Sequence, residues 1–139
     1  MILDLWWLPI VPAAVAAIVD IRLRRLPNVI VIPALLASLS FAVYGGHIAV
    51  ALAGAVLAAA VGLAIRVAAR GGFGLGDVKL LAYGGSIVGI TGLTTFLTGT
   101  AIGGGVLGAL YLGSRGRQAS VPYGVAITLG LALAVGLSD

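Results

Sequence analysis

Two aspartates are the residues of this sequence best suited to acid–base chemistry. The chain of 139 residues has four acidic residues, all of them aspartates. Asp4 and Asp139 lie at the two ends, which leaves Asp20 and Asp77 in the interior. When two carboxyl groups face one cleft they do not both ionise readily, so one keeps a proton. The ionised partner can then take a proton from water while the protonated partner polarises a peptide carbonyl, which is general acid–base hydrolysis.

Composition excludes several other chemistries. The chain has no cysteine and a single histidine, His47. A disulfide scaffold, a thiolate zinc site, a cysteine nucleophile and a histidine-rich metal site are therefore excluded. The glycine-rich segments lack the Gly-Lys-Ser/Thr sequence and the preceding strand of a phosphate-binding loop. We expect no metal, no cofactor and no nucleic-acid partner.

The elements that position the aspartates must be membrane-spanning helices. Hydrophobic residues make up 61% of the chain and charged residues 9%, and the mean hydropathy is +1.22. A soluble domain carries about 25% charged residues, so this sequence cannot build an ordinary water-soluble surface. The composition predicts an all-α, multi-pass protein in the lipid bilayer.

Charges and turn residues divide the chain into six apolar stretches. A bilayer needs about 20 apolar residues per helix, and shorter spans are tolerated when the bilayer thins. Residues 80–112 would form one helix of about 50 Å, too long for one crossing, so we predict a break between Gly89 and Gly92. A tight turn is predicted at 45–47. The predicted spans are 5–19, 29–44, 48–65, 80–88 extended back into the preceding loop, 93–112 and 123–137.

The basic residues predict the orientation in the membrane. Short cytoplasmic loops collect Lys and Arg, and all eight cations fall in alternate predicted loops. This places these loops in the cytoplasm and both termini outside. It also supports the break in 80–112, because a single span there would put the last two arginines on the opposite side. The cations are Arg22, Arg24, Arg25, Arg66, Arg70, Lys79, Arg115 and Arg117.

Asp20 and Asp77 belong to the same membrane face. Two predicted spans separate them, and an even number of crossings returns the chain to the side it left. Asp20 is expected within or just beyond the last turn of the first span, where a carboxylate is costly. It is either a topology charge paired with Arg22 or Arg24, or one half of an acid pair that faces a watery cleft.

The second aspartate follows a glycine-rich segment that begins at Gly71. Gly74 and Gly76 remove side chains beside Asp77 and permit non-helical backbone. Such backbone at membrane depth is tolerated only inside the protein or beside a watery cavity. We therefore expect either a catalytic loop or a flexible cytoplasmic loop with an incidental acid.

Three motifs resemble those of the type IV prepilin peptidases, membrane aspartic proteases of the Gly-x-Gly-Asp class. The first begins at Asp20, with Pro27 and Asn28 following it. The second is Gly74-Leu-Gly-Asp-Val-Lys-Leu-Leu81, and the third is Val121-Pro-Tyr-Gly-Val-Ala126. The short length and the form of the third motif look most like the small branch that serves Flp, or tight-adherence, pili.

The resemblance implies a role for each matched residue. Asp20 and Asp77 would be the catalytic pair, Gly74 and Gly76 would shape the backbone beside Asp77, and Lys79 would lie at the cytoplasmic edge. It also implies a single peptidase domain over 1–139 in the cytoplasmic (inner) membrane. The substrate would be a prepilin whose leader is cut after a glycine, on the cytoplasmic side. The chain lacks the paired Cys-x-x-Cys domain of longer members, so methyltransferase activity is not expected.

Two other classes of function stay open on the residues alone. A small transporter or channel could use the aspartates for proton or cation coupling. A non-catalytic assembly protein of a secretion system would need neither aspartate. Glycine pairs at four-residue spacing, such as 85/89, 99/103 and 104/108, predict close helix packing in either case.

Overall fold

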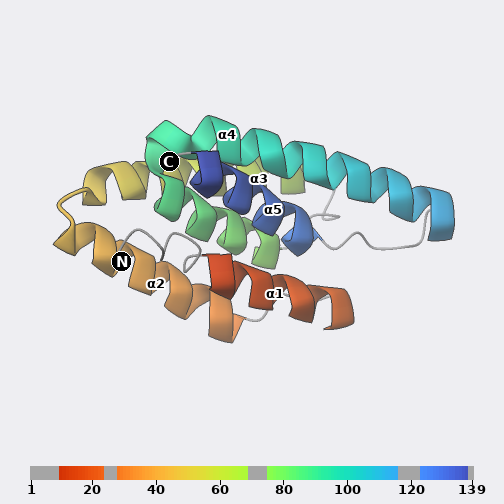
Figure 1. Ribbon diagram of the computed structural model, residues 1–139, viewed down its shortest axis with the longest axis horizontal. Coiled ribbons are helices and arrows are strands. Elements are labelled where there is room, and N and C mark those ends of the chain that lie inside the picture. The colour runs from red at the N-terminus through yellow and green to blue at the C-terminus, as the bar shows by residue number, and fades with distance from the viewer. Residues whose placement is uncertain (1–9, 24–27, 69–74, 116–122, 138–139) are drawn as a thin grey trace.

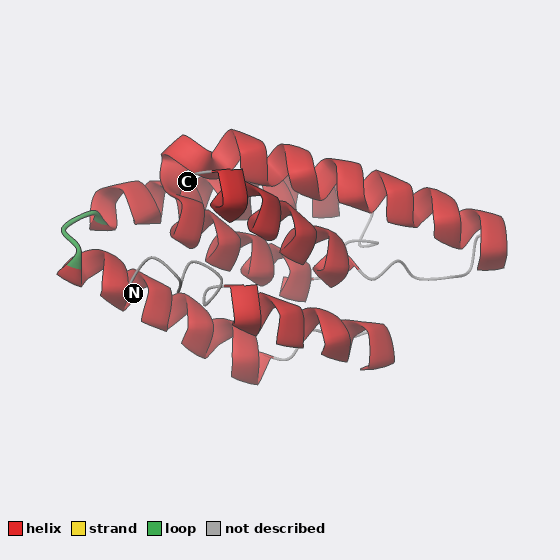
Figure 2. Ribbon diagram, in the orientation of Figure 1, coloured by secondary structure: helices red, strands yellow, loops and turns green. Residues whose placement is uncertain are grey.

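The described part of the chain is entirely helical. The computed structural model describes residues 10–23, 28–68, 75–115 and 123–137 (Figures 1 and 2). This confirms the predicted all-α class for the part of the chain that is described. The helices are α1 (Ile10–Leu23), α2 (Asn28–Tyr44), α3 (Ile48–Ala68), α4 (Leu75–Arg115) and α5 (Tyr123–Leu137).

The long helix α4 is broken at Gly89. This residue has φ 67° and ψ −177°, a conformation that is essentially restricted to glycine. Figure 1 shows that the chain reverses direction there, so the first half of α4 (residues 75–88) and the second half (residues 90–115) run back along each other. The break predicted between Gly89 and Gly92 is confirmed.

Several helices extend further than the sequence predicts. The first extends to Leu23 and the third to Ala68, whereas the start of α4 at Leu75 agrees with the predicted extension of 80–88 back into the preceding loop. Arg22 and Arg66 lie in the last turns of α1 and α3. Cations near a helix C-terminus interact favourably with its dipole, and their long side chains can reach polar surroundings. A prediction based on the apolar residues alone therefore places the ends of these helices too early in the sequence. Residues 5–9 of the first predicted span lie outside the described residues.

The turn between α2 and α3 has a glycine-based helix cap. The His47 N–H donates to the Ala42 carbonyl at 3.0 Å, and the Gly46 N–H donates to the Val43 carbonyl at 3.2 Å. Gly46 has φ 74°. These two bonds and the left-handed glycine form a Schellman motif, which satisfies carbonyls at the end of α2. The predicted tight turn is confirmed.

The first half of α4 is the centre of the bundle. Every residue from 77 to 86 is buried except Lys79, which is half-buried. On one side, Gly54 of α3 and Gly85 of α4 are so close that a Cβ on either would collide with the other's carbonyl oxygen. On another side, the fully buried Phe96 ring from the second half of α4 covers Gly84.

Glycines also bring α5 against the second half of α4. A Cβ added at Gly99 would lie 3.0 Å from the Gly130 Cα, and one added at Gly103 would lie 3.4 Å from the Ala126 Cα. The glycine pairs 85/89 and 99/103 thus pack against neighbouring helices, as predicted. The third pair differs, because a Cβ at Gly108 meets open space among the described residues.

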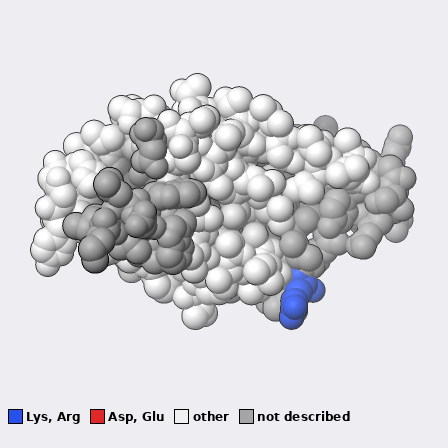
Figure 3. Space-filling model, in the orientation of Figure 1, with Lys and Arg blue, Asp and Glu red and all other residues white. Residues whose placement is uncertain are grey.

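The described cations lie on helix ends that point the same way. In Figure 1 the C-terminal ends of α1 and α3, the first and last turns of α4 and the start of α5 all point to the right, and only the last turns of α4 reach the right-hand end of the molecule. Arg22, Arg66, Lys79 and Arg115 belong to these segments. The face in Figure 3 is uncharged over the described residues except toward its right-hand side. The direction of these helix ends is compatible with the loop assignment.

The described helices include two that are long and apolar enough to cross a membrane by length and composition. These are Ile48–Ala68 and Leu75–Leu110. Three shorter apolar helices accompany them: Ile10–Val19, Val29–Tyr44 and Gly124–Leu137. Many large apolar side chains are exposed, among them Val29, Phe41 and Val67. Exposure of this kind fits a surface that lipid covers.

Candidate active site

Asp77 lies in the first turn of α4 and is buried, with 9% of its surface exposed. A carboxylate is favourable there, because the N-terminal end of a helix carries a partial positive charge. The prediction of non-helical backbone at Gly76 and Asp77 is therefore wrong. Glycine is tolerated in a helix whose neighbours approach closely, and the dipole favours the acid that follows. Gly74 lies outside the described residues.

The start of α4 is held in place by a glycine of α3 that sequence reasoning missed. A Cβ added at Gly62 would lie 3.3 Å from the Val78 Cα and 3.0 Å from the Leu81 Cδ1. Gly62 thus lets α3 approach the residue directly after Asp77. A stripe of small residues at helical spacing could have revealed this face, since the buried residues of α3 are Ala51, Gly54, Ala55, Ala58 and Gly62.

Lys79 shares the first turns of α4 with Asp77 but lies on another side of the helix. Residues two positions apart on a helix do not face each other. Lys79 is half-buried, whereas both of its neighbours, Val78 and Leu80, are buried. Its predicted position at a membrane edge stays a prediction.

Asp20 lies within α1, three residues before its end at Leu23. The buried stripe of this helix consists of Ala13, Ala16 and Ala17. Position 20 follows these residues by seven, four and three positions, so the backbone of α1 carries it on the same side of the helix. That side packs against the rest of the bundle.

The two aspartates lie on different helices of the bundle. In Figure 1 the C-terminal end of α1 and the N-terminal end of α4 both point to the right, away from the α2–α3 turn and from the break at Gly89. Helix α1 packs on α5 and α2, and both of these helices also pack on α4. The prediction that both aspartates lie on one membrane face stays a prediction, and the direction of the two helices is compatible with it.

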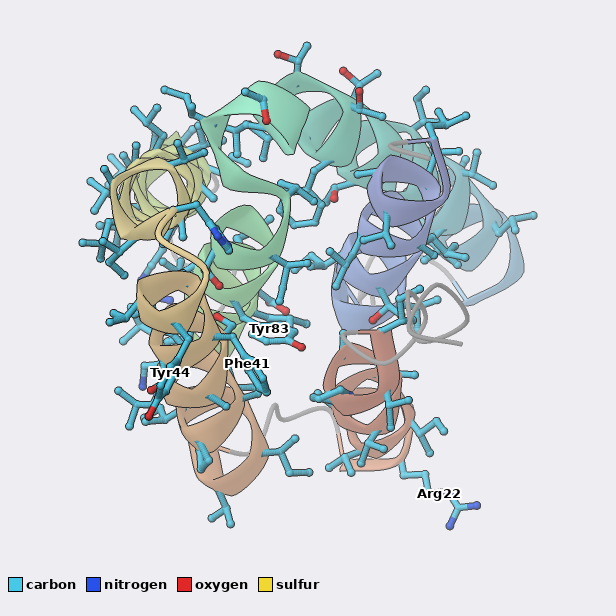
Figure 4. All side chains as sticks on the ribbon, turned by 60° about the vertical axis from the view of Figure 1, so that its left-hand side comes forward. Arg22, Phe41, Tyr44 and Tyr83 are labelled. Atoms are coloured by element: carbon cyan, nitrogen blue, oxygen red, sulfur yellow. The ribbon has the colours of Figure 1, made fainter. Side chains whose placement is uncertain are left out.

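The interior between these helices also contains a polar side chain, that of Tyr83, which the sequence analysis did not identify. Tyr83 is only 3% exposed. In Figure 4 its side chain points from α4 toward the interior of the bundle, whereas Tyr44 and Arg22 lie at the outside. Within the described ranges, no three side chains of His, Asp or Glu come together as metal ligands.

The fold and the site define a bundle of apolar helices with two acids on separate helices, and comparison with known families places the chain more narrowly. The profile of the Type IV leader peptidase family matches residues 7–110. The chain belongs to this family. The match includes both Asp20 and Asp77, whereas the third sequence motif, at 121–126, lies beyond it. No curated protein and no solved structure matches the chain.

Family membership establishes the general nature of the protein. It indicates a peptidase, and the substrates of the family are in general prepilins. Together with the apolar helices it indicates a membrane protein. The resemblance inferred from the three motifs is therefore confirmed at the level of the family.

Proposed function

We propose that this chain is a membrane aspartic endopeptidase that removes the leader of a type IV, Flp-like prepilin at the cytoplasmic face of the inner membrane. Asp20 and Asp77 form the catalytic pair. The observation that carries the proposal is the family match over both aspartates, combined with the burial of Asp77 in the first turn of α4.

The chemistry follows from two carboxyl groups in a poorly hydrated site. Close carboxyl groups share a proton, because two negative charges in a low dielectric repel strongly. The carboxylate takes a proton from a water molecule, whose oxygen then attacks the scissile carbonyl carbon. The carboxylic acid donates its hydrogen bond to the carbonyl oxygen, and a proton passes to the leaving amine as the C–N bond breaks. Gly74 and Gly76 leave room for an extended peptide beside Asp77.

Single substitutions of the acids test the catalytic pair. Membranes that contain Asp20→Asn or Asp77→Asn, incubated with a Flp-type prepilin, should show no cleavage beyond the rate without enzyme. Asp139→Asn removes an acid of the same type from the other predicted side and should cleave like the wild type. Full cleavage by either interior variant would refute the assignment of that residue.

The substrate class is tested on the prepilin itself. A prepilin whose glycine before the cut is replaced by a large residue should resist cleavage, and the mature pilin should not be processed. We expect cleavage to fall on both the acidic and the basic side of an optimum, because one carboxyl group must be ionised and the other protonated. Cleavage of the glycine-replaced prepilin at the wild-type rate would contradict a leader peptidase.

The proposed topology has six spans with both termini outside the cytoplasm. The reversal at Gly89 supports it, because the two halves of α4 then cross separately. The natural chain has no cysteine, so single reporters can be read without background. A cysteine at Arg22 should react with an impermeant maleimide only from the cytoplasmic side, and one at the 92% exposed Tyr44 only from outside. Reaction of both from the same side would refute this topology.

A further inference from the structure

One side-chain hydrogen bond links α1 to α5. The Thr128 Oγ1 lies 3.0 Å from the Ala13 carbonyl oxygen and 2.8 Å from the carbonyl oxygen of Gly124 in its own helix. The second contact is the local bond that threonines in membrane helices commonly make, and the single hydroxyl hydrogen is shared between the two carbonyl oxygens. Thr100 makes the same local bond, to Phe96 at 2.9 Å. The feature that distinguishes Thr128 is its reach to α1.

Among the described residues, the buried side chains of α1 are small. Its buried side presents Ala13, Ala16 and Ala17, whose methyl groups permit close approach but interlock weakly. Its other side exposes large apolar residues, including Val15 and Ile18. A directed hydrogen bond to a backbone carbonyl sets both the depth and the rotation of a helix, which a row of methyl groups does not.

By fixing α1 at Ala13, this bond also fixes the position of Asp20. Asp20 follows Ala13 by seven residues, so it lies two helical turns, or about 10 Å, further along the same side of α1. A shift or rotation of α1 at Ala13 is therefore transmitted by a rigid helix to the backbone at position 20.

The same stretch of α5 is tied to the helix that carries Asp77. Two residues after Thr128, Gly130 packs against Thr100 and Phe96 in the second half of α4. The Phe96 ring in turn covers Gly84, in the first half of α4. Helix α5 thus connects the helices of both aspartates within a single turn.

We propose that Thr128 is a positioning residue, which holds α1 in register on α5 so that Asp20 is aligned with Asp77. The proposal rests on the proposed function, in which both aspartates are catalytic. Thr128 itself lies two turns from the reacting groups and takes no part in the proton transfers.

The kinetic test uses matched threonine variants. Thr128→Val keeps the shape and removes the hydroxyl, Thr128→Ser restores a hydroxyl, and Thr100→Val removes a hydroxyl that bonds only within its own helix. Because small misplacements of catalytic groups cost up to about 100-fold, kcat should fall at least ~10-fold in Thr128→Val with an unchanged KM. Thr128→Ser and Thr100→Val should stay within about twofold of the wild type. Equal losses in the two valine variants would overturn the proposal.

A second measurement reads the position of α1 without using activity. A single cysteine at Arg22, at the end of α1, is labelled with a soluble maleimide in each background. Its labelling rate should change with Thr128→Val and stay constant with Thr128→Ser and Thr100→Val. An unchanged rate combined with a lowered kcat would overturn positioning through α1. If Thr128→Val does not yield folded protein, Thr128→Ala removes the hydroxyl with less bulk and should give the same result.

The outcomes separate this proposal from the proposed function. Asp20→Asn leaves Thr128 and the packing of α1 in place, so it reports on the catalytic assignment alone. A Thr128→Val enzyme with wild-type kcat beside an inactive Asp20→Asn enzyme would overturn the positioning role and leave the proposed function standing. Cleavage by Asp20→Asn would refute the catalytic assignment, whatever the labelling shows.

Discussion

The two helices that carry the acids are held in very different ways. The first half of α4 contacts α3, α2 and its own second half, and glycines bring its backbone close to its neighbours. Helix α1 packs through one stripe of alanines, and its opposite side exposes Val11, Val15 and Ile18. Asp77 is thus built into the most tightly packed part of the bundle, whereas Asp20 is carried by a helix at its periphery.

This difference in packing predicts that substitutions near one helix change the stability of the fold, whereas substitutions near the other change the alignment of Asp20 with Asp77. Backbone contacts at glycines leave no room for side chains, so changes around the first half of α4 should act mainly on folding. A helix docked through small residues can move without unfolding the bundle, so changes on α1 should act mainly on the position of Asp20. Variants in the two regions should therefore show opposite ratios of lost stability to lost activity.

The largest effect on stability is expected for Gly85→Leu. A Cβ at Gly85 would collide with the Gly54 carbonyl and lie 2.8 Å from the Ala58 Cβ. Because the obstacle is largely backbone, α3 and α4 must separate, at a cost of about 3 kcal/mol or more. Thermal unfolding in detergent, followed by size-exclusion chromatography, measures this loss. Gly105→Leu is the matched control, since a Cβ there meets nothing within 4 Å among the described residues. Equal melting temperatures for the two variants would contradict a glycine-dependent core.

Gly89→Ala should come next, because it combines strain with a clash. The residue has φ 67°, and a Cβ would lie 2.6 Å from the Val50 Cγ1. A non-glycine residue in this conformation costs about 1–3 kcal/mol. Adding Val50→Ala should recover the part due to the clash and leave the part due to φ. Gly46→Ala is the control, since it has φ 74° and open space around its Cβ position. Its loss in the same thermal assay should be smaller; a larger loss for Gly46→Ala would contradict the role of Val50.

The sequence predicts the helices well and their contacts poorly, for a physical reason. Apolar runs, turn residues and cation positions depend on local chemistry, so the bundle, the turn at 45–47 and the break near Gly89 could all be predicted. The exact ends could not, because cations such as Arg22 extend helices beyond their apolar runs. The contact of Gly62 with Val78 and the bond from Thr128 to Ala13 depend on which helices become neighbours. No local sequence pattern predicts these neighbours.

For the candidate site too, the sequence predicts the residues better than their surroundings. Asp20 and Asp77 could be selected because so few ionisable residues exist, and counting crossings predicts one membrane face for both. The conformation at Gly76 and Asp77 was predicted wrongly, because glycines were read as loop formers. In the folded chain the helix dipole favours Asp77 in a first turn, and α3 packs closely against Val78.

Ala13→Leu should lower activity far more than stability. Ala13 is fully buried against α5, and three additional heavy atoms there must push α1 away. Because the opposite side of α1 is exposed, the helix can move outward, so we expect a stability loss of only about 1 kcal/mol. Prepilin cleavage should fall at least ~10-fold, since Asp20 moves with α1. Val15→Leu, on the exposed side, is the control and should leave both quantities unchanged. A loss of stability in Ala13→Leu as large as that of Gly85→Leu would remove the contrast between the two helices.

The smallest effect is expected at the hydroxyl pair that joins α2 to the first half of α4. The hydroxyls of Ser38 and Ser86 contact each other. Ser38 is also placed to donate to the Leu35 carbonyl at 3.0 Å, and Ser86 to the Tyr83 carbonyl at 2.6 Å. Two hydroxyl hydrogens cannot serve three bonds at once, so removing one hydroxyl leaves the other with its local carbonyl.

Each single variant, Ser38→Ala or Ser86→Ala, should therefore cost only about 0.6 kcal/mol, the average for such bonds between membrane helices. The double variant should cost little more than either single one, because the shared bond is lost only once. Thermal unfolding of the four proteins measures this coupling. Ser40→Ala is the control, because its exposed hydroxyl bonds within α2 alone. Strict additivity of the two substitutions would show that the hydroxyls do not share a bond. Glycine packing and apolar contacts would then hold the first half of α4 without help from the hydroxyls of α2.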